Sequence, residues 1–442
     1  MPSVDRSEPR PADPRLAAAL GRLDALINWE RKGRGRMRVT LEPARDLCAR
    51  LGDPQRCAPA VHVTGSKGKG SVCALVAAGL GAAGLRAGRY GSPHVERIGE
   101  RVVIDGCEVA DEALAAGIER ALEAREAALA EGSAARDATW FDLLTAAAWC
   151  ALEAARVQWL VVECGLGGRF DSTNTLDGEV CVITGVELEH TSVLGTTRAA
   201  IAGEKAGILK RGATLVTPLT AEDEAGRVVA EAAAELAVGV LRPAWLAGGA
   251  RPTIAERNLA LARLVLDELG RRGHGGSDGT PLAGALLSPA VARAARLPGR
   301  LEERWLGATR VLVDGAHTPG SVADVLTDLA ATPPWGARRP VVVLALNRDK
   351  DLGGVLKSLG GRVDRVICTS VGGALAQPPE QIAEAARSLD LAAETADNPR
   401  MALERARDLT PSGGWVLVLG SLYLAGAIRP LVKNEPPHAA TC

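Results

Sequence analysis

Short runs of apolar, mostly β-branched residues recur along this chain, separated by longer alanine-rich segments with helical spacing. Strands that alternate with helices in this way predict an α/β fold built on largely parallel sheets. The runs are continuously apolar, which indicates that both faces of each sheet are covered. We expect strands at 61–63, 159–162, 180–184, 214–216, 310–313, 340–344, 365–368 and 415–419.

The segments between these runs predict helices. A helical pattern covers 72–80, and a capping box of Thr253 and Glu256 opens a helix that continues to about Gly270. Residues 111–135 combine many alanines with charges of both signs, which favours an exposed helix whose charges face solvent.

One domain boundary is expected near Arg296–Arg300, because this Pro/Gly segment separates two blocks of strand–helix units. The predicted domains are therefore 15–296 and 297–433. The polar termini, 1–14 and 434–442, are expected to be disordered.

Composition narrows the class of protein. The 442 residues carry a net charge of −1, so the chain has no basic field to attract nucleic acid or anionic lipid. The longest apolar stretch, 415–428, contains glycines and a serine and is too short to span a membrane. Nine cysteines without C-x-x-C spacing indicate reduced thiols. We expect a cytoplasmic protein that binds neither nucleic acid nor membranes.

A glycine-rich turn, GSKGKGS at 65–71, is the most informative local pattern. It follows an apolar run and precedes a helical pattern, and that arrangement is typical of phosphate-binding loops. Glycines let backbone N–H groups converge on phosphate oxygens, and lysine reaches the terminal phosphates. The additional Gly70 departs from the usual Gly-Lys-Ser/Thr ending, so an ordinary glycine-rich connection is the alternative at this point.

Polar residues follow several predicted strands directly. Glu163 ends an apolar run and precedes three glycines, and His190 follows the next run. Because ligands of open α/β sheets collect at the carboxyl ends of strands, a magnesium site is one interpretation. A solvated glutamate and a structural histidine are the alternatives. Taken by itself, Lys205 is a surface charge.

Nine segments in this order resemble the folylpolyglutamate synthase/dihydrofolate synthase family of the Mur ligase superfamily. They include HVTGSKGKGS at 62–71, VVECGLGGRFDSTN at 161–174 and VDGAH at 313–317. The others are 91–94, 139–142, 189–191, 204–208, 297–302 and 420–423. The resemblance implies a P-loop-type ATP-binding domain with a mostly parallel sheet, followed by a smaller Rossmann-like α/β ligase domain.

The implied reaction is ATP-dependent amide formation. In this family ATP phosphorylates a pteroate or folate carboxylate, L-glutamate attacks the acyl phosphate, and ADP and phosphate leave. Such chemistry depends on Mg²⁺ and cationic groups rather than on a covalent nucleophile. The implied catalytic residues are Lys69, Glu163, His190 and Lys205.

The resemblance also implies a set of ligand contacts. Nucleotide contacts would be Ser66, Lys67, Gly68, Lys69, Gly70, Ser71, Asn258, Arg300 and Asp314. Acceptor contacts would be Thr139, Trp140, Phe141, Asp142, Phe170, Asp171, Ser172 and His317. Two Mg²⁺ ions would be held by Ser92, Glu163, His190 and Lys205. Lys205 would be carbamylated, since an unmodified ammonium beside two metal ions is electrostatically unfavourable.

Several positions depart from the family pattern. Ser66-Lys67 stands where Thr-Asn is usual, and Lys67 either adds a phosphate contact or points to solvent. Asp142 replaces glutamate, Ser172 replaces alanine, and Glu189 replaces aspartate; Thr318 stands where asparagine is usual. These departures leave the ligase interpretation intact and leave the acceptor open.

Two rival functions remain at this stage. A Mur-type ligase for another acceptor carboxylate would be inactive with dihydropteroate and glutamate. A non-catalytic nucleotide-binding regulator would bind ATP without releasing ADP, and the complete set of implied catalytic residues argues against it. A monomer is expected, and whether the first or later glutamates are added is open.

Overall fold

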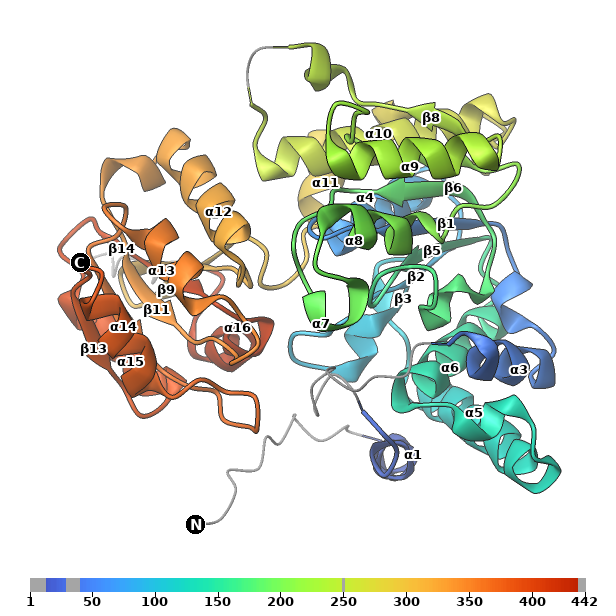
Figure 1. The fold of residues 1–442 in the computed structure, drawn as a ribbon, viewed down its shortest axis with the longest axis horizontal. Coiled ribbons are helices and arrows are strands. Elements are labelled where there is room, and N and C mark those ends of the chain that lie inside the picture. The colour runs from blue at the N-terminus through green and yellow to red at the C-terminus, as the bar shows by residue number, and fades with distance from the viewer. Residues whose placement is uncertain (1–12, 29–39, 249–250, 436–442) are drawn as a thin grey trace, which may run out of the picture. The chain divides into compact units, whose positions relative to one another are not determined.

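The structure, a computed structural model, describes residues 13–28, 40–248 and 251–435 (Figure 1). It divides into two compact units, the first ending at Arg296 and the second beginning at Leu297. The termini predicted to be disordered fall almost entirely outside the described residues.

The first unit is built on one sheet. Its strands among the described residues are β1 (Ala60–Thr64), β2 (Ala87–Tyr90), β3 (Val102–Ile104), β4 (Cys107–Glu108), β5 (Trp159–Glu163), β6 (Gly178–Ile183), β7 (Thr214–Val216) and β8 (Gly239–Leu241). Their order is β4-β3-β2-β5-β1-β6-β7-β8. The strands from β2 to β8 in this order are parallel, and β3 and β4 extend the edge in antiparallel pairing.

Helices cover both faces of this sheet. They are α1 (Pro14–Asp24), α3 (Glu42–Arg50), α4 (Lys69–Ala82), α5 (Asp111–Glu131), α6 (Trp140–Ala154), α7 (Thr191–Leu194), α8 (Arg198–Ala206), α9 (Glu224–Glu235), α10 (Ile254–Arg271) and α11 (Pro289–Ala294). Along β5, Leu160 and Val162 join the core beneath α5 and α6, whereas Val161 joins the core beneath α4 and α10. Burial on both faces explains the continuously apolar strands.

The second unit has its own smaller sheet. Its strands are β9 (Glu302–Leu306), β10 (Thr309–Val313), β11 (Val341–Leu344), β12 (Arg365–Cys368), β13 (Ala393–Thr395) and β14 (Trp415–Leu419). Their order is β13-β12-β11-β14-β10-β9, parallel except for β9. The helices of this unit are α12 (Pro319–Ala331), α13 (Leu352–Leu359), α14 (Pro379–Arg387), α15 (Pro399–Leu409) and α16 (Leu422–Ile428). The predicted α/β class, with two mostly parallel sheets, is confirmed.

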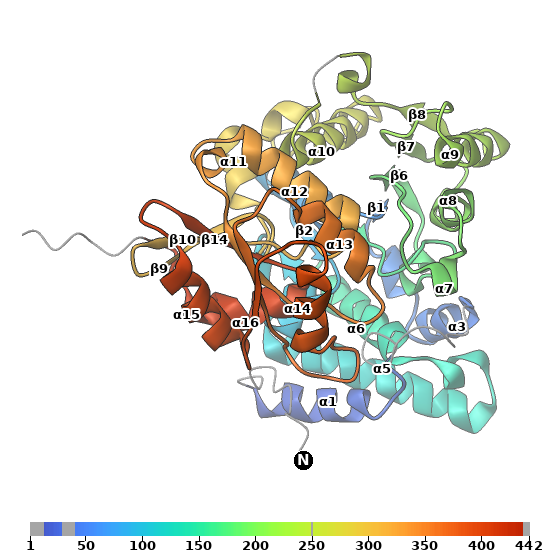
Figure 2. The same ribbon diagram turned by 60° about the vertical axis from the view of Figure 1, so that its left-hand side comes forward.

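All eight predicted strands are present, but six further strands of the described residues were missed: β2, β3, β4, β8, β9 and β13. The strand β2 escaped prediction because glycine and arginine occupy its centre. A Cβ on Gly88 would lie 2.6 Å from Leu152 on α6, so glycine lets this strand approach the helix. The exposed helix predicted over 111–135 is wrong in one respect: α5 buries one face, including Leu114 and Ile118, against α6 (Figure 2).

Candidate active site

The glycine-rich turn at 65–71, called the phosphate turn below, joins the end of the inner strand β1 to the start of α4. Gly65 and Gly68 have φ angles of 140° and 82°, which favour glycine. Added Cβ atoms would lie 2.0 Å from Thr184 Oγ1 and 2.4 Å from Asn258 Oδ1. No side chain among the described residues caps α4, which begins at Lys69, so its first N–H groups can bind an anion.

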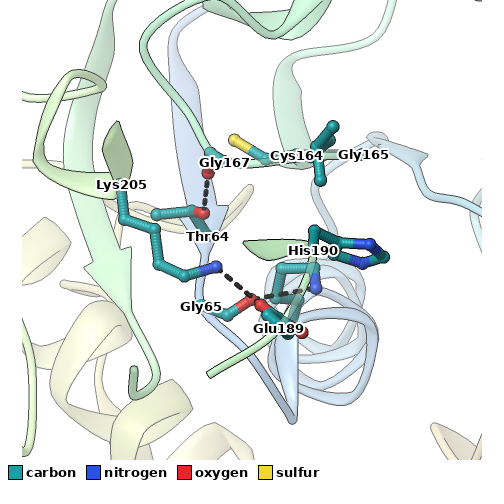
Figure 3. Close-up of a pocket in the computed structure, with 10 residues that line it drawn as sticks. Thr64, Gly65, Cys164, Gly165, Gly167, Glu189, His190 and Lys205 are labelled. Carbon is teal, nitrogen blue, oxygen red and sulfur yellow. Dashed lines mark hydrogen bonds and ion pairs between the residues drawn. The ribbon is translucent and has the colours of Figure 1, made fainter. Parts of the chain in front are cut away.

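β1 lies between β5 and β6, and parallel strands end at the same edge of a sheet. The segments that follow β5 (164–167) and β6 (189–190) therefore lie near this turn, and Lys205 of α8 joins them. Together they line one pocket (Figure 3). It brings together Lys69, His190 and Lys205, three of the four implied catalytic residues. The lining residues are Thr64, Gly65, Lys69, Cys164, Gly165, Leu166, Gly167, Glu189, His190 and Lys205. In this pocket Lys69 Nζ donates a hydrogen bond to the carbonyl oxygen of Gly65, at 3.0 Å.

A buried ion pair forms one wall of the pocket. Lys205 Nζ lies 2.9 Å from Glu189 Oε1, and the two side chains are 2% and 13% exposed. Burial opposes ionisation of Glu189, but the positive charges of Lys205 and Lys69 outweigh it and lower the pKa of Glu189 to about 2. Burial also lowers the pKa of Lys205, against the pull of Glu189. Lys205 is therefore not the surface charge that its local sequence suggests.

Glu163 lies at the end of β5, beside Val63 of β1, and is 8% exposed. Its Oε2 accepts a hydrogen bond from the backbone N–H of Ser92, at 3.3 Å. The structure thus places the implied metal ligands in two pairs, Glu163 with Ser92 and His190 with Lys205. Within the described residues, no three His, Cys, Asp or Glu side chains are gathered closely enough to hold a metal ion by themselves.

The donor set nevertheless fits a magnesium–nucleotide complex. Mg²⁺ prefers oxygen ligands and usually keeps waters and substrate phosphates around one or two carboxylates. The buried Glu163 carboxylate and the Ser92 hydroxyl supply such oxygens beside the phosphate turn. A carbamate on Lys205 would bring a second negative charge near the Glu189 carboxylate, and a divalent cation would compensate it.

The implied acceptor segments are joined by a hydrogen-bond network. Thr139 caps α6 and donates to Asp142 Oδ2 from both its N–H and its hydroxyl, at 2.8 Å each. Asp142 Oδ1 accepts from Ser172 Oγ at 2.6 Å. Two of the departures from the family pattern, Asp142 and Ser172, are therefore direct partners.

The aromatic residues of these segments differ in burial. Trp140 is 3% exposed and donates its Nε1–H to Asp24, so it is part of the core. The ring of Phe141 lies against Gly165, where a Cβ would come within 2.5 Å of it. Phe170 is 41% exposed. Asp171 accepts the N–H of Leu166 at 2.7 Å, and burial raises the pKa of this carboxyl.

In the second unit, Asp314 follows β10 and holds its own loop together. Its Oδ2 accepts the N–H of Leu301 at 2.8 Å and its Oδ1 accepts the N–H of Ala316 at 2.7 Å. Burial raises the pKa of Asp314, although the neighbouring Arg300 opposes this. The Nδ1–H of His317 donates to the carbonyl oxygen of Gly315, at 2.8 Å.

Two residues near the site were missed by sequence reasoning. Glu187 pairs with Lys67, and its position four residues after the end of β6 was the available signal. Arg101 is 2% exposed, donates to His94 Nδ1 at 2.9 Å and lies over the ring of Trp140. Nothing local in the sequence indicates that this arginine is buried.

Comparison with known proteins defines the class of this one. The Mur ligase, glutamate ligase domain model matches residues 299–422. The Mycobacterium tuberculosis dihydrofolate synthase/folylpolyglutamate synthase is 31% identical over 434 residues, covering 87% of this chain and 88% of the relative. A Mur-type nucleotide-binding unit followed by a glutamate ligase unit defines an ATP-dependent ligase.

Solved structures agree over nearly the whole chain. The Mycobacterium tuberculosis folylpolyglutamate synthase complexed with ADP has a TM-score of 0.80 and 29% identity, covering 96% of this chain and 99% of that one. The Yersinia pestis bifunctional folylpolyglutamate synthase/dihydrofolate synthase complexed with AMPPNP and Mn has a TM-score of 0.78 and 28% identity, covering 96% and 99%. This chain belongs to the folylpolyglutamate synthase/dihydrofolate synthase family. Among the described residues, the helices include none with the length and apolarity to cross a membrane.

Proposed function

We propose that this chain joins L-glutamate to the carboxylate of a pteroate or folate through an acyl phosphate formed with ATP. The observation that supports this most strongly is the pocket that unites Lys69, His190 and Lys205 beside the uncapped start of α4. The chain's membership of a family of glutamate ligases points to the same reaction.

Different residues of the first unit have different roles in phosphoryl transfer. The backbone N–H groups of 66–71, with the side chains of Ser66 and Ser71, bind the triphosphate. Asn258, which lies close to Gly68, is a further nucleotide contact. Lys69 exchanges its bond to the Gly65 carbonyl for the terminal phosphates. In this role its charge stabilises the negative charge that develops during transfer.

Magnesium would be held by Ser92 and Glu163 on one side and by His190 and a carbamylated Lys205 on the other, giving two ions. It would neutralise the triphosphate and orient it toward the acceptor carboxylate. The lowered pKa of Lys205 favours the neutral amine that carbamate formation requires. Glu189, which lies 2.9 Å from Lys205 Nζ, would then be a carboxylate near the carbamate, and the positive charge of the metal ion would compensate the two negative charges.

The remaining assignments are proposals that the family resemblance supports. Phe141 and Phe170 contact the acceptor, with the network of Thr139, Asp142 and Ser172 behind them. Arg300, Asp314 and His317 belong to the second domain, 297–433, and serve nucleotide and acceptor binding. We further propose a monomer that works in the cytoplasm.

Phosphate release by the purified chain tests this function. Dihydropteroate and tetrahydrofolate are compared as acceptors, each with and without L-glutamate. We expect release that depends on both the acceptor and glutamate, and mass spectrometry should find a product heavier by one glutamyl residue. Absence of glutamate-dependent turnover with either acceptor would refute the substrate assignment, and turnover with another acid would identify a different ligase.

A further inference from the structure

The two lysines of the phosphate turn have different partners. Lys69 lines the pocket, whereas Lys67 is not among its lining residues. The Nζ of Lys67 is shielded from solvent and lies 2.5 Å from Glu187 Oε1. Lys67 therefore has a carboxylate partner, which neither sequence-based alternative, a phosphate contact or a solvent-exposed charge, includes.

Other bonds connect the same two segments. The N–H of Ser66 donates to the carbonyl oxygen of Gly185, and the N–H of Glu187 donates to Ser66 Oγ, both at 2.9 Å. The hydroxyl of Thr184 donates to the carbonyl oxygen of Lys67 at 2.5 Å. Hydrogen bonds thus join the phosphate turn to residues 184–187, and the ion pair adds a further contact between them.

The segment that begins at Thr184 continues into the pocket. Glu189, the partner of Lys205, lies two residues after Glu187, and His190 follows it. His190 has a φ of 48° and precedes α7, a helix of only four residues. Such a short element gives little rigidity of its own, so the position of this segment depends on its bonds to the turn.

We propose that Lys67 is a positioning residue: its ion pair with Glu187 holds residues 184–190 against the phosphate turn, so that Lys69 and His190 face one pocket. Lys67 does not bind phosphate. The inference rests on the nucleotide-binding step of the proposed function and not on the identity of the acceptor.

A double-mutant cycle separates the two roles. Binding of AMPPNP is measured by calorimetry with saturating and with limiting Mg²⁺, without acceptor or glutamate, for Lys67→Met, Glu187→Gln and both together. The pair is partly exposed, at 29% and 38%, so each single change should weaken binding about 2- to 5-fold. The double variant should match the singles, because all three lack the same interaction. The Mg²⁺ concentration for half-saturation should rise in parallel.

The charge-reversed double variant, Lys67→Glu with Glu187→Lys, should bind within about twofold of the wild type, because it restores the pair. The control is Glu119→Gln, whose ion pair with Arg15 joins α1 to α5 outside the pocket; it should leave binding unchanged. A phosphate contact predicts a different result: roughly a ten- to hundredfold loss for Lys67→Met, no loss for Glu187→Gln, and the weakest binding for the reversed pair. The proposal would be overturned by this phosphate-contact pattern. It would also be overturned if the effects of the two single variants add in the double variant, or if the single variants bind AMPPNP like the wild type.

AMPPNP binding with no ligation of glutamate would refute the proposed function and leave this inference standing.

Discussion

Replacing Glu189 with Gln tests the buried ion pair of the pocket. The change keeps the shape of the side chain and removes the charge that faces Lys205 Nζ at 2.9 Å. The pKa of Glu189 lies at about 2 against 4.5 for an unpaired carboxyl, a difference that corresponds to about 3 kcal/mol. Breaking a buried pair on one side generally costs about 3–5 kcal/mol. We expect the free energy of unfolding to fall by about 3 kcal/mol at pH 7.

The sign of the pH dependence follows from the lowered pKa. A carboxyl whose pKa is lower in the folded state contributes stability above its unfolded pKa of 4.5, and this is lost as the pH falls toward about 2. The glutamine variant lacks this contribution at every pH. The difference in stability between wild type and variant should therefore be full at pH 6–7 and shrink below pH 4.5.

Urea unfolding followed by circular dichroism at pH 7, 5, 4 and 3.5 measures this difference. Glu119→Gln removes an ion pair whose arginine side chain is 53% exposed, and it should change stability by less than about 1 kcal/mol. Adding Lys205→Met to the Glu189 variant should restore part of the loss, because no unpaired charge then stays buried. A loss below about 1 kcal/mol at pH 7, or a difference that grows in acid, would refute the reasoning.

Three further predictions concern activity. Lys69→Ala should lower ATP turnover by more than about a hundredfold with an unchanged circular dichroism spectrum, because the turn itself depends on its glycines; turnover near the wild-type rate would contradict the phosphate role. Lys205→Ala should lose activity and regain part of it with added acetate or propionate, which replaces the carbamate carboxylate; no rescue at any concentration would argue against the carbamate. Ser172→Ala removes the 2.6 Å bond to Asp142 and should raise the KM for the acceptor a few-fold while leaving the KM for ATP unchanged; an equal change in both would argue against an acceptor role.

Much of the site could be predicted because its signals are local. The spacing of its glycines identifies the turn at 65–71, and Glu163 and His190 each follow an apolar run. The order of β5, β1 and β6 then brings these strand ends to one edge of the sheet. The predicted assembly of all implied metal ligands around one centre stays a prediction, since the pocket includes His190 and Lys205 but not Glu163.

The partnerships between side chains were beyond the reach of local patterns. Nothing near Lys205 in the sequence distinguishes it from a surface charge, yet it is among the largest fully buried side chains. The bond between Asp142 and Ser172 joins residues 30 positions apart, and the pair of Lys67 and Glu187 bridges a still longer interval. Each depends on packing that only the folded chain creates.

The amino-acid sequence by itself determined the α/β class, the strand–turn–helix pattern that is predicted to bind phosphate and the identity of the groups available for chemistry, because helix caps, strand burial and glycine turns are set by neighbours along the chain. Tertiary structure alone decided which charges are buried and which face each other. The order of the strands in the sheet places strand ends that are distant in the sequence side by side. The burial of a lysine or glutamate side chain then determines whether it stabilises a loop, shifts the pKa of a neighbour or faces the pocket.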